Sequence, residues 1–404
     1  MLINKTYFID SCDDVELNIK RESKLEYRIT YDDEKEMKAV VFVIGGYGAN
    51  ANIHFLDYDR KFLCQKFNVV IINVFYHCFC QRRSNSQKYN ASTIFTEYDL
   101  PHLKLVLEHF NLQTSKLDTS TALIHYDALN QTINDLKEKN LLSQDYQAHF
   151  SATFIPPNNE YQNYGIMAAI DHINALKDIL NKYPQFKTLP KIYGGGSYGG
   201  YLALMCAKIA PWYVDGVIDN SGAALPPLHY IVGRDMNVGD CSFNDPNIFV
   251  HCFLKTYWTR KNPNSPYYFA DENYLIRALL NQTHLILQTQ KNKDIVYISY
   301  HSLVDEFKTA DDKKSLYEIY QSLNYNATLY MIANKKDIDG RFIKSLEHGL
   351  RMSDKALFNK ELPNMLEKLK DKEFSIREDS ISYPCKDKVF TFKDKDDKFV
   401  LELN

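Results

Sequence analysis

Residues 191–201 read Lys-Ile-Tyr-Gly-Gly-Gly-Ser-Tyr-Gly-Gly-Tyr and are the most informative part of the chain. It places Ser197 in a Gly-x-Ser-x-Gly pattern with Gly195 and Gly199, between a short apolar run and a segment with helical spacing. A serine at such a strand-to-helix turn has a strained backbone, and the flanking glycines let strand and helix approach each other. The start of the helix also directs backbone N–H groups at the serine, which suits a developing oxyanion. The stretch therefore predicts a nucleophile elbow around Ser197.

The same glycines fit two other glycine-rich motifs less well. A phosphate-binding P-loop requires a lysine directly before the serine or threonine, and no lysine adjoins Ser197. A dinucleotide fingerprint follows the first strand of its unit and has an acid at the end of the next strand, whereas this loop lies in mid-sheet. A plain glycine-rich turn is the structural alternative to the elbow.

The sequence on either side predicts an α/β fold with a mainly parallel central sheet. Two continuous apolar runs, residues 38–44 and 69–75, are typical of strands buried on both faces. Residues 53–66 between them have room for the crossover helix that parallel strands need. Apolar residues recur at helical spacing over 164–183, and strand and helix patterns alternate again over 295–332. We expect helices on both faces of the sheet.

Two stretches interrupt this alternation. Residues 81–161 are polar and lose the strand–helix rhythm, and residues 223–282 are irregular and rich in aromatic side chains. We therefore expect a single domain over residues 1–404 with two insertions, 81–161 and 223–282, and a C-terminal extension over 361–404. The aromatic side chains of the second insertion suit contacts with a sugar or an acyl chain, or a small core of its own.

Composition argues against several classes of protein. The chain has 48 Lys and Arg against 51 Asp and Glu, and a net charge of −3 does not favour a nucleic-acid partner. No apolar stretch has the length of a membrane span, and the N-terminal sequence lacks the apolar core of a secretory signal. The 8 cysteines show no paired metal-ligand spacing. We expect a cytoplasmic protein with reduced thiols, no metal and no cofactor.

The elbow and its surroundings resemble the α/β-hydrolase superfamily, particularly its esterases and prolyl-oligopeptidase-like serine hydrolases. In that superfamily an oxyanion loop, the nucleophile, an acid and a histidine follow one another along the chain. Residues 41–48, Val-Phe-Val-Ile-Gly-Gly-Tyr-Gly, resemble its His-Gly-x-Gly oxyanion loop, with Gly45 in place of the histidine. The resemblance implies that the backbone N–H groups of Tyr47 and Tyr198 form the oxyanion hole. The alternative for this loop is a plain glycine turn after a strand.

The acid and the histidine are assigned by the same resemblance. Residues 298–305, Ile-Ser-Tyr-His-Ser-Leu-Val-Asp, look like the superfamily's strand ending in His-Gly-x-x-Asp, which makes Asp305 the expected acid. Asp219 is the alternative acid, because some members carry it at the end of the preceding strand. His348 follows the last core strand and precedes Gly349, as the catalytic histidine often does in the superfamily. Asp305 would then hold the tautomer of His348.

The reaction implied is acyl transfer through an acyl-enzyme on Ser197, resolved by water or by an alcohol. A serine hydrolase acting on a small or carbohydrate O-acyl ester is the first expectation. A sugar acyltransferase with the same triad and a non-catalytic binding protein of the same fold are the alternatives. In the superfamily, insertions such as 223–282 commonly form a lid or cap. Arg82 and Arg83 follow a strand and are candidates to bind a substrate carboxylate or phosphate, with a solvated charge pair as the alternative.

The whole chain also resembles an uncharacterised bacterial family of hydrolase-like proteins associated with surface-glycan genes. That resemblance implies a sugar, such as a nonulosonic acid, as the carrier of the O-acyl group. It is a fold-level analogy and identifies no further residues of the site.

Overall fold

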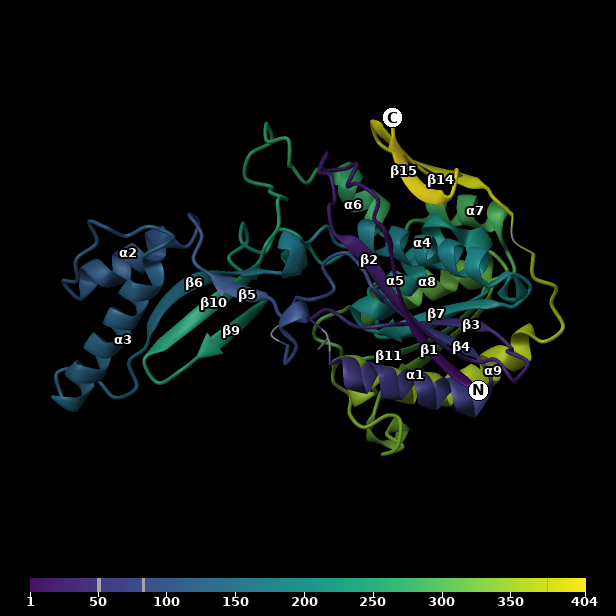
Figure 1. The fold of residues 1–404 in the computed structure, drawn as a ribbon, viewed down its shortest axis with the longest axis horizontal. Helices are drawn as coiled ribbons and strands as arrows, with labels where there is room; N and C mark the ends of the chain where they lie inside the picture. Colours follow the sequence, from purple (N-terminus) through teal and green to yellow (C-terminus); the bar gives the residue numbers. More distant parts are fainter. Residues whose placement is uncertain (49–51, 82–83, 376) are drawn as a thin grey trace. The chain divides into compact units, whose positions relative to one another are not determined.

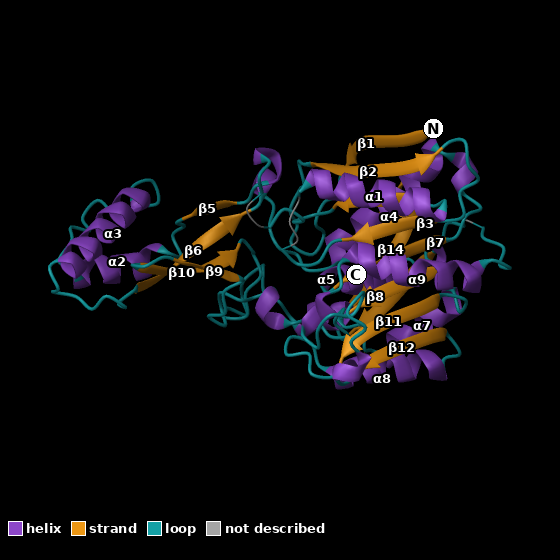
Figure 2. Ribbon diagram, turned by 90° about the horizontal axis from the view of Figure 1, so that it is seen from below, coloured by secondary structure: helices purple, strands orange, loops and turns teal. Residues whose placement is uncertain are grey.

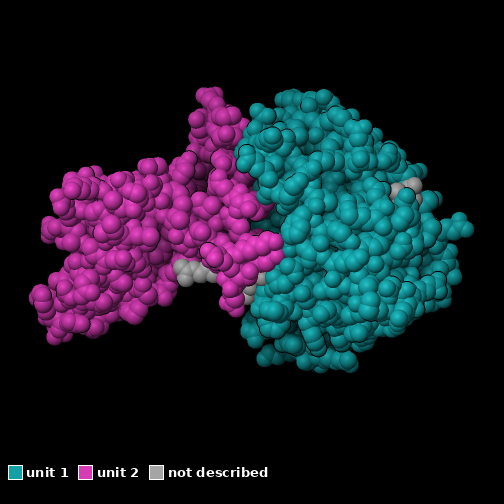
Figure 3. Space-filling model, viewed as in Figure 1, with its two compact units in different colours: residues 1–79, 163–227, 269–404 teal, residues 80–162, 228–268 magenta. Residues whose placement is uncertain are grey.

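The computed structural model describes residues 1–404 except 49–51, 82–83 and 376 (Figure 1). It divides into two compact units (Figure 3). Unit 1 comprises Met1–Phe79, Asn163–Pro227 and Phe269–Asn404, and unit 2 comprises Cys80–Gln162 and Leu228–Tyr268. Unit 2 is thus built from two chain segments that overlap the insertions expected at 81–161 and 223–282. Arg82 and Arg83 lie outside the described residues.

Within its described residues, unit 1 is built on an eight-stranded sheet with the order β1-β2-β4-β3-β7-β8-β11-β12. The strands from β4 to β12 are parallel, and β1 and β2 are antiparallel to their neighbours. Every residue of β4 and four of the five residues of β3 are buried, which explains the two continuous apolar runs in the sequence. The bounds are β1 (Leu2–Asp10), β2 (Lys24–Asp32), β3 (Val40–Ile44), β4 (Val70–Phe75), β7 (Lys191–Gly196), β8 (Gly216–Asn220), β11 (Val296–Ser302) and β12 (Asn326–Ile332).

Helices cover both faces of this sheet, as predicted (Figures 1 and 2). One face carries α1 (Ile53–Phe67) and α9 (Asp354–Leu369), which pack against each other. The other face carries α4 (Ile166–Lys182), α5 (Tyr198–Ile209), α7 (Gln282–Lys291) and α8 (Ala310–Ser322), with α6 (Asp271–Arg277) beside them. Across the described part of the chain, none of the helices combines the length and apolar character needed to cross a membrane.

A small antiparallel sheet covers the helices of the second face. It consists of β13 (Ser380–Cys385), β14 (Lys388–Lys395) and β15 (Lys398–Leu403), of which the last two form an antiparallel hairpin. β15 packs against α4, where the side chain of Asn174 bonds both the N–H and the carbonyl of Phe399 at 2.8 and 2.9 Å. Lys177 forms an ion pair with Asp394 at 2.6 Å. Residues of α4 and α5 are therefore almost all buried.

Proline favours the first turn of a helix, yet Pro363 does not begin one here. Helix α9 begins at Asp354 and contains Pro363 in its interior. The hydroxyl of Ser353 caps the first turn by accepting the N–H of Ala356. Burial of Phe358 and the other apolar residues of α9 against the sheet offsets the hydrogen bond that a proline cannot make.

Unit 2 has a core of its own. In its described residues a four-stranded sheet has the order β5-β6-β10-β9, with α2 (Leu100–His109) and α3 (Ala122–Glu138) beside it. β6 and β10 come from distant segments and pair in parallel. The strands are β5 (Ser92–Ile94), β6 (Ala148–Ile155), β9 (Cys241–Asn244) and β10 (Ile248–Leu254). The carboxylate of Asp99 is buried and accepts hydrogen bonds from Ser151, Thr153 and Arg234 at 2.6, 2.7 and 3.0 Å.

Candidate active site

Ser197 lies between β7 and α5 with φ 55° and ψ −118°, a conformation that L-residues rarely adopt. Its N–H donates to the carbonyl of Asn220 at 2.7 Å, which ties the turn to β8. A Cβ atom at Gly195 or at Gly199 would lie 2.0 Å from the carbonyl oxygen of Ile44. The end of β3 thus approaches the turn so closely that both flanking positions require glycine.

The side chain of Ser197 meets His348, and His348 meets Asp305. The Oγ of Ser197 is 2.7 Å from Nε2 of His348, and Nδ1 of His348 is 2.8 Å from Oδ2 of Asp305. A carboxylate only accepts, so Nδ1 carries the hydrogen and Nε2 is left to accept the serine proton. The structure brings these three residues together from separate segments: the turn after β7, the loop after β11 and a short 3-10 helix over His348–Arg351.

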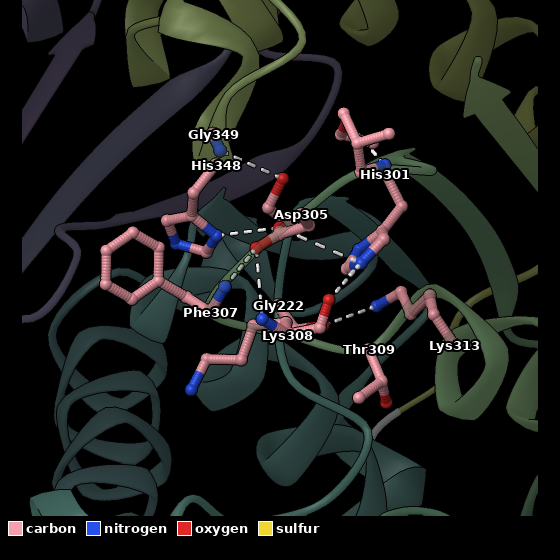
Figure 4. Close-up of polar contacts among 12 residues, drawn as sticks. Gly222, His301, Asp305, Phe307, Lys308, Thr309, Lys313, His348 and Gly349 are labelled. Carbon is pink, nitrogen blue, oxygen red and sulfur yellow. Dashed lines mark hydrogen bonds and ion pairs between the residues drawn. The ribbon is translucent and has the colours of Figure 1, made fainter.

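The environment of Asp305 keeps its carboxylate charged (Figure 4). Burial opposes ionisation, but the hydrogen bond from His348 and the N–H groups of Phe307 and Lys308, at 2.9 and 3.0 Å, hold the pKa of Asp305 below its ordinary value. The ring of Phe307, which is 59% exposed, lies edge-on to the imidazole of His348 with the ring centroids 5.3 Å apart. An anionic acid and an apolar side chain therefore flank the histidine.

A second histidine supports the acid from its other side, as Figure 4 shows. His301 is fully buried, and its Nε2 lies 3.2 Å from the carbonyl of Lys308 and 3.8 Å from Oδ2 of Asp305. Burial and the charge of Lys313 lower the pKa of His301, so the ring is neutral at neutral pH. The contact between His301 and the carbonyl of Lys308 closes the turn that carries Asp305. In the sequence, His301 was identified only as one position of the strand motif at residues 298–305, and no role was assigned to it.

The alternative acid, Asp219, has other partners. Its side chain is fully buried and forms an ion pair with Lys313. It also accepts hydrogen bonds from the hydroxyl of Ser299 at 2.7 Å and from the N–H of Gly222 at 2.8 Å. Lys313 in turn donates to the carbonyl of Gly222 at 3.0 Å (Figure 4). The nitrogen Nδ1 of His348 therefore pairs with Asp305, while Asp219 binds a buried lysine.

Polar side chains at the strand ends hold the histidine loop. Asn220 donates through its amide to the carbonyl of Gly349 at 2.8 Å, and the N–H of Gly349 donates to the hydroxyl of Ser221 at 3.1 Å. Ser302, the last residue of β11, donates to the carbonyl of Leu346 at 2.5 Å. Sequence reasoning did not find these residues. For Asn220 and Ser221 the signal was the run of polar residues at the carboxyl end of β8, beside the elbow.

The predicted oxyanion loop lies against the elbow. A Cβ atom at Gly46 would be 3.1 Å from the carbonyl oxygen of Gly196, and the rings of Tyr47 and Tyr198 meet edge to face with their centroids 5.7 Å apart. Tyr198 is the first residue of α5, and its buried hydroxyl accepts the N–H of Gly165 at 2.9 Å. The backbone of Tyr198 is thus held by α5, and its side chain is held through the hydroxyl. The oxyanion role of the Tyr47 and Tyr198 amides belongs to the proposal below.

The side chains that could bind a metal ion or an anion are those of His, Cys, Asp and Glu and the arginine pair at 82 and 83. In the chain apart from 49–51, 82–83 and 376, no group of three or more His, Cys, Asp or Glu side chains is arranged to hold a metal ion. All 8 cysteines fall in the described residues and are free thiols. The predicted anion-binding pair, Arg82 and Arg83, lies outside the described residues.

Sheet order, crossover helices and the strained serine turn together define a protein of the α/β-hydrolase fold. The chain belongs to the family described as "Protein of unknown function (DUF2920)", whose model matches residues 5–403. A search of curated proteins finds no match.

Solved structures similar to this chain include two peptidases and an esterase. The acylaminoacyl peptidase of Pyrococcus horikoshii has 13% identity and a TM-score of 0.45, over 94% of this chain and 43% of that chain. The puromycin-hydrolyzing peptidase of Mycobacterium tuberculosis has 11% identity and a TM-score of 0.46, over 93% and 40%. The Pyrobaculum calidifontis esterase has 10% identity and a TM-score of 0.43, over 92% and 86%. The chain thus spans less than half the length of the two peptidases.

Proposed function

We propose that the protein is a serine hydrolase that cleaves an ester through an acyl-enzyme on Ser197. The observation that carries the proposal is the continuous relay from Ser197 Oγ through His348 to Asp305, with contacts of 2.7 and 2.8 Å, at a strained strand-to-helix turn. Nucleophile, base and orienting acid are the three roles that acyl transfer by a serine requires.

In the first half-reaction the Oγ of Ser197 attacks the ester carbonyl carbon while its proton moves to Nε2 of His348. The charge that develops on the carbonyl oxygen is stabilised by the backbone N–H groups of Tyr47 and Tyr198. The tetrahedral intermediate then breaks its bond to the alcohol oxygen, which takes the proton from Nε2 and leaves. Asp305 remains a carboxylate throughout and stabilises the imidazolium form of His348.

In the second half-reaction water replaces the alcohol. His348 takes a proton from the water as its oxygen attacks the acyl carbon, and a second tetrahedral intermediate forms. Its collapse breaks the bond to Ser197, returns the proton to Oγ and releases a carboxylic acid. If a sugar hydroxyl takes the place of water, the same steps give an acyltransferase.

As substrate we propose a small ester, with an O-acyl sugar as the particular candidate. The proposal of a sugar rests on the sequence resemblance described above. The exposed ring of Phe307 beside His348 offers an apolar surface for the acyl group at the reacting centre. The lid role expected for the insertions rests on the resemblance alone. Substrate binding by Arg82 and Arg83 rests on their position after a strand in the sequence.

The first experiment is labelling with a fluorophosphonate probe, which reacts with activated serines. We expect the parent to be labelled and Ser197→Ala not to be. Ser322→Ala is the matched control, because Ser322 is exposed on α8 and bonds only within its helix. A folded parent that neither takes the probe nor hydrolyses p-nitrophenyl acetate would favour the non-catalytic alternative.

A substrate screen follows if the parent is labelled. Short p-nitrophenyl esters and O-acetylated sugars are compared, with and without free sugar as the acceptor. Release of the free acid in both cases supports the hydrolase. Transfer of the acyl group to the added sugar in preference to water would instead establish the acyltransferase.

A further inference from the structure

The peptide N–H that directly precedes the nucleophile is bound by a side chain from a distant helix. The N–H of Gly196 donates to Oδ1 of Asp354 at 2.8 Å. Asp354 is the first residue of α9 and follows the N-cap Ser353. Neither the sequence motif nor the triad geometry assigns Asp354 a role.

The course of β3 explains why this N–H needs a side-chain acceptor. β7 pairs with β3 up to Gly195, which lies opposite Ile44. The carbonyl of the next residue, Gly45, accepts the hydroxyl of Tyr76 at 3.0 Å instead of continuing the ladder. Successive N–H groups of a strand alternate between its neighbours, and the N–H of Ser197 points to β8. The N–H of Gly196 therefore faces the side where β3 has diverged, and Asp354 takes the place of the missing strand.

One short segment contacts both the nucleophile's turn and the nucleophile itself. His348 reaches Oγ of Ser197 from one end of residues 348–354, and Asp354 reaches the N–H of Gly196 from the other end. A Cβ atom on Gly196 would lie 3.3 Å from Oδ1 of Asp354, so the carboxyl fits tightly against the turn. The two contacts together set the position of the base relative to the serine.

The surroundings of Asp354 disfavour a charged carboxylate at this position. Although part of the residue reaches the surface, burial of its carboxyl raises the pKa of Asp354 to about 7, and the charge of Asp59 on α1 acts in the same direction. Lys355 is committed to Asp59, at 2.8 Å. A charged acceptor at the start of a helix is favourable for that helix, but desolvation opposes the charge. The contact with Gly196 gives the side chain a role beyond capping α9.

We propose that Asp354 is a positioning residue that clamps the nucleophile elbow through its acceptor oxygen and thereby keeps Ser197 in register with His348. The inference rests on the proposed function. Loss of the acceptor frees the N–H of Gly196, and the turn relaxes away from its strained conformation. Because a small misplacement of reacting groups slows chemistry without changing the contacts that bind substrate, the loss falls on kcat rather than on KM.

The test compares three variants with the parent on p-nitrophenyl acetate. Asp354→Ala removes the acceptor and should lower kcat by about 10- to 100-fold, with KM within about twofold. Asp354→Asn keeps an acceptor oxygen in the same place and should restore kcat to within about threefold of the parent. Ser353→Ala is the matched control: it removes the cap of the same helix without touching the elbow, so melting temperature falls while kcat stays. The rate of fluorophosphonate labelling should follow kcat.

Three results would overturn the clamp: a parent-like kcat in folded Asp354→Ala, an Asp354→Asn as slow as the alanine variant, or an equal loss in Ser353→Ala. If Asp354→Ala does not fold, Asp354→Leu, which has a similar shape and no acceptor, takes its place in the same comparison. An inactive, unlabelled parent is a different outcome, because there the proposed function itself fails and the clamp falls with it.

Discussion

At the scale of residues, two buried aspartates at the ends of neighbouring strands have different partners. Asp305, after β11, faces an imidazole and two backbone N–H groups, whereas Asp219, on β8, faces a buried ammonium group. Both side chains are fully buried. A carboxylate beside an imidazole can stabilise the positive charge that the imidazole gains during a reaction. A carboxylate paired with a buried lysine instead stabilises the folded state, because it neutralises a charge that has lost its water.

Exchange of Asp305 for an amide should therefore lower activity, whereas the same exchange at Asp219 should lower stability. Asp305→Asn should lower kcat by about 10⁴-fold, because an amide cannot hold the required tautomer of His348. Asp219→Asn should leave kcat nearly unchanged and lower the free energy of unfolding by about 3 to 5 kcal/mol, because the charge of Lys313 stays buried without a partner. Ester hydrolysis and urea unfolding of both variants measure the two effects. A folded Asp219→Asn without activity, beside an active Asp305→Asn, would make Asp219 the acid.

The sequence led to Ser197, Asp305 and His348 because each stands in a local pattern and the three follow one another in a known order. Asp354 and Asn220 stand in no such pattern. Each acts on a residue far along the chain, Asp354 on Gly196 and Asn220 on Gly349. Contacts of this kind depend on where the sheet places the segments, so spacing along a single sequence does not reveal them.

At the scale of elements, the close approach of β3, β7 and α5 shapes the nucleophile turn. The carbonyl of Ile44 occupies the space where side chains at Gly195 and Gly199 would lie. Strand β3 and its neighbour β4 were predicted correctly, because burial on both faces makes them continuous apolar runs. In unit 2 the strand β6 (Ala148–Ile155) was not predicted, because its parallel partner β10 comes from a distant segment and the surrounding sequence is polar.

Gly199→Ala tests this approach. The new Cβ would lie 2.0 Å from a backbone oxygen that cannot move without shifting β3, so we expect the variant to lose at least about 3 kcal/mol of folding free energy and all probe labelling. Gly340→Ala is the control, since its Cβ would meet nothing within 4 Å, and its φ of 69° should cost only about 1 kcal/mol. Thermal melts compare the two. Equal losses would show that crowding at the elbow has no special effect.

At the scale of the whole molecule, each of the two compact units has an ion pair whose carboxylate is buried. In unit 2 the carboxylate of Asp99 pairs with Arg234, whose charge, with two hydroxyl groups, holds the pKa of Asp99 below its ordinary value although burial opposes ionisation. In unit 1 Lys177 pairs with Asp394. Separate cores allow each unit to unfold in a transition of its own.

Scanning calorimetry of two variants checks this. Asp99→Ala should lower the midpoint of one transition, by an amount equivalent to about 3 kcal/mol, because Arg234 loses its buried partner. Lys177→Ala, the counterpart in unit 1, should lower the other transition and leave the first in place. If both variants shift one common transition, the two units unfold as a single cooperative body.

The sheet β13–β15 also bears on the order in which the chain can fold during synthesis. A ribosome releases the elbow, Asp305 and His348 before residues 380–403 emerge, yet the outer side of α4 is covered by β15 and bonded to it through Asn174 and Phe399. Until those residues arrive, the apolar and amide groups of α4 face water or a chaperone. The cover over α4 can therefore form only after residues 380–403 have been synthesised. These residues are made later than every residue of the candidate site.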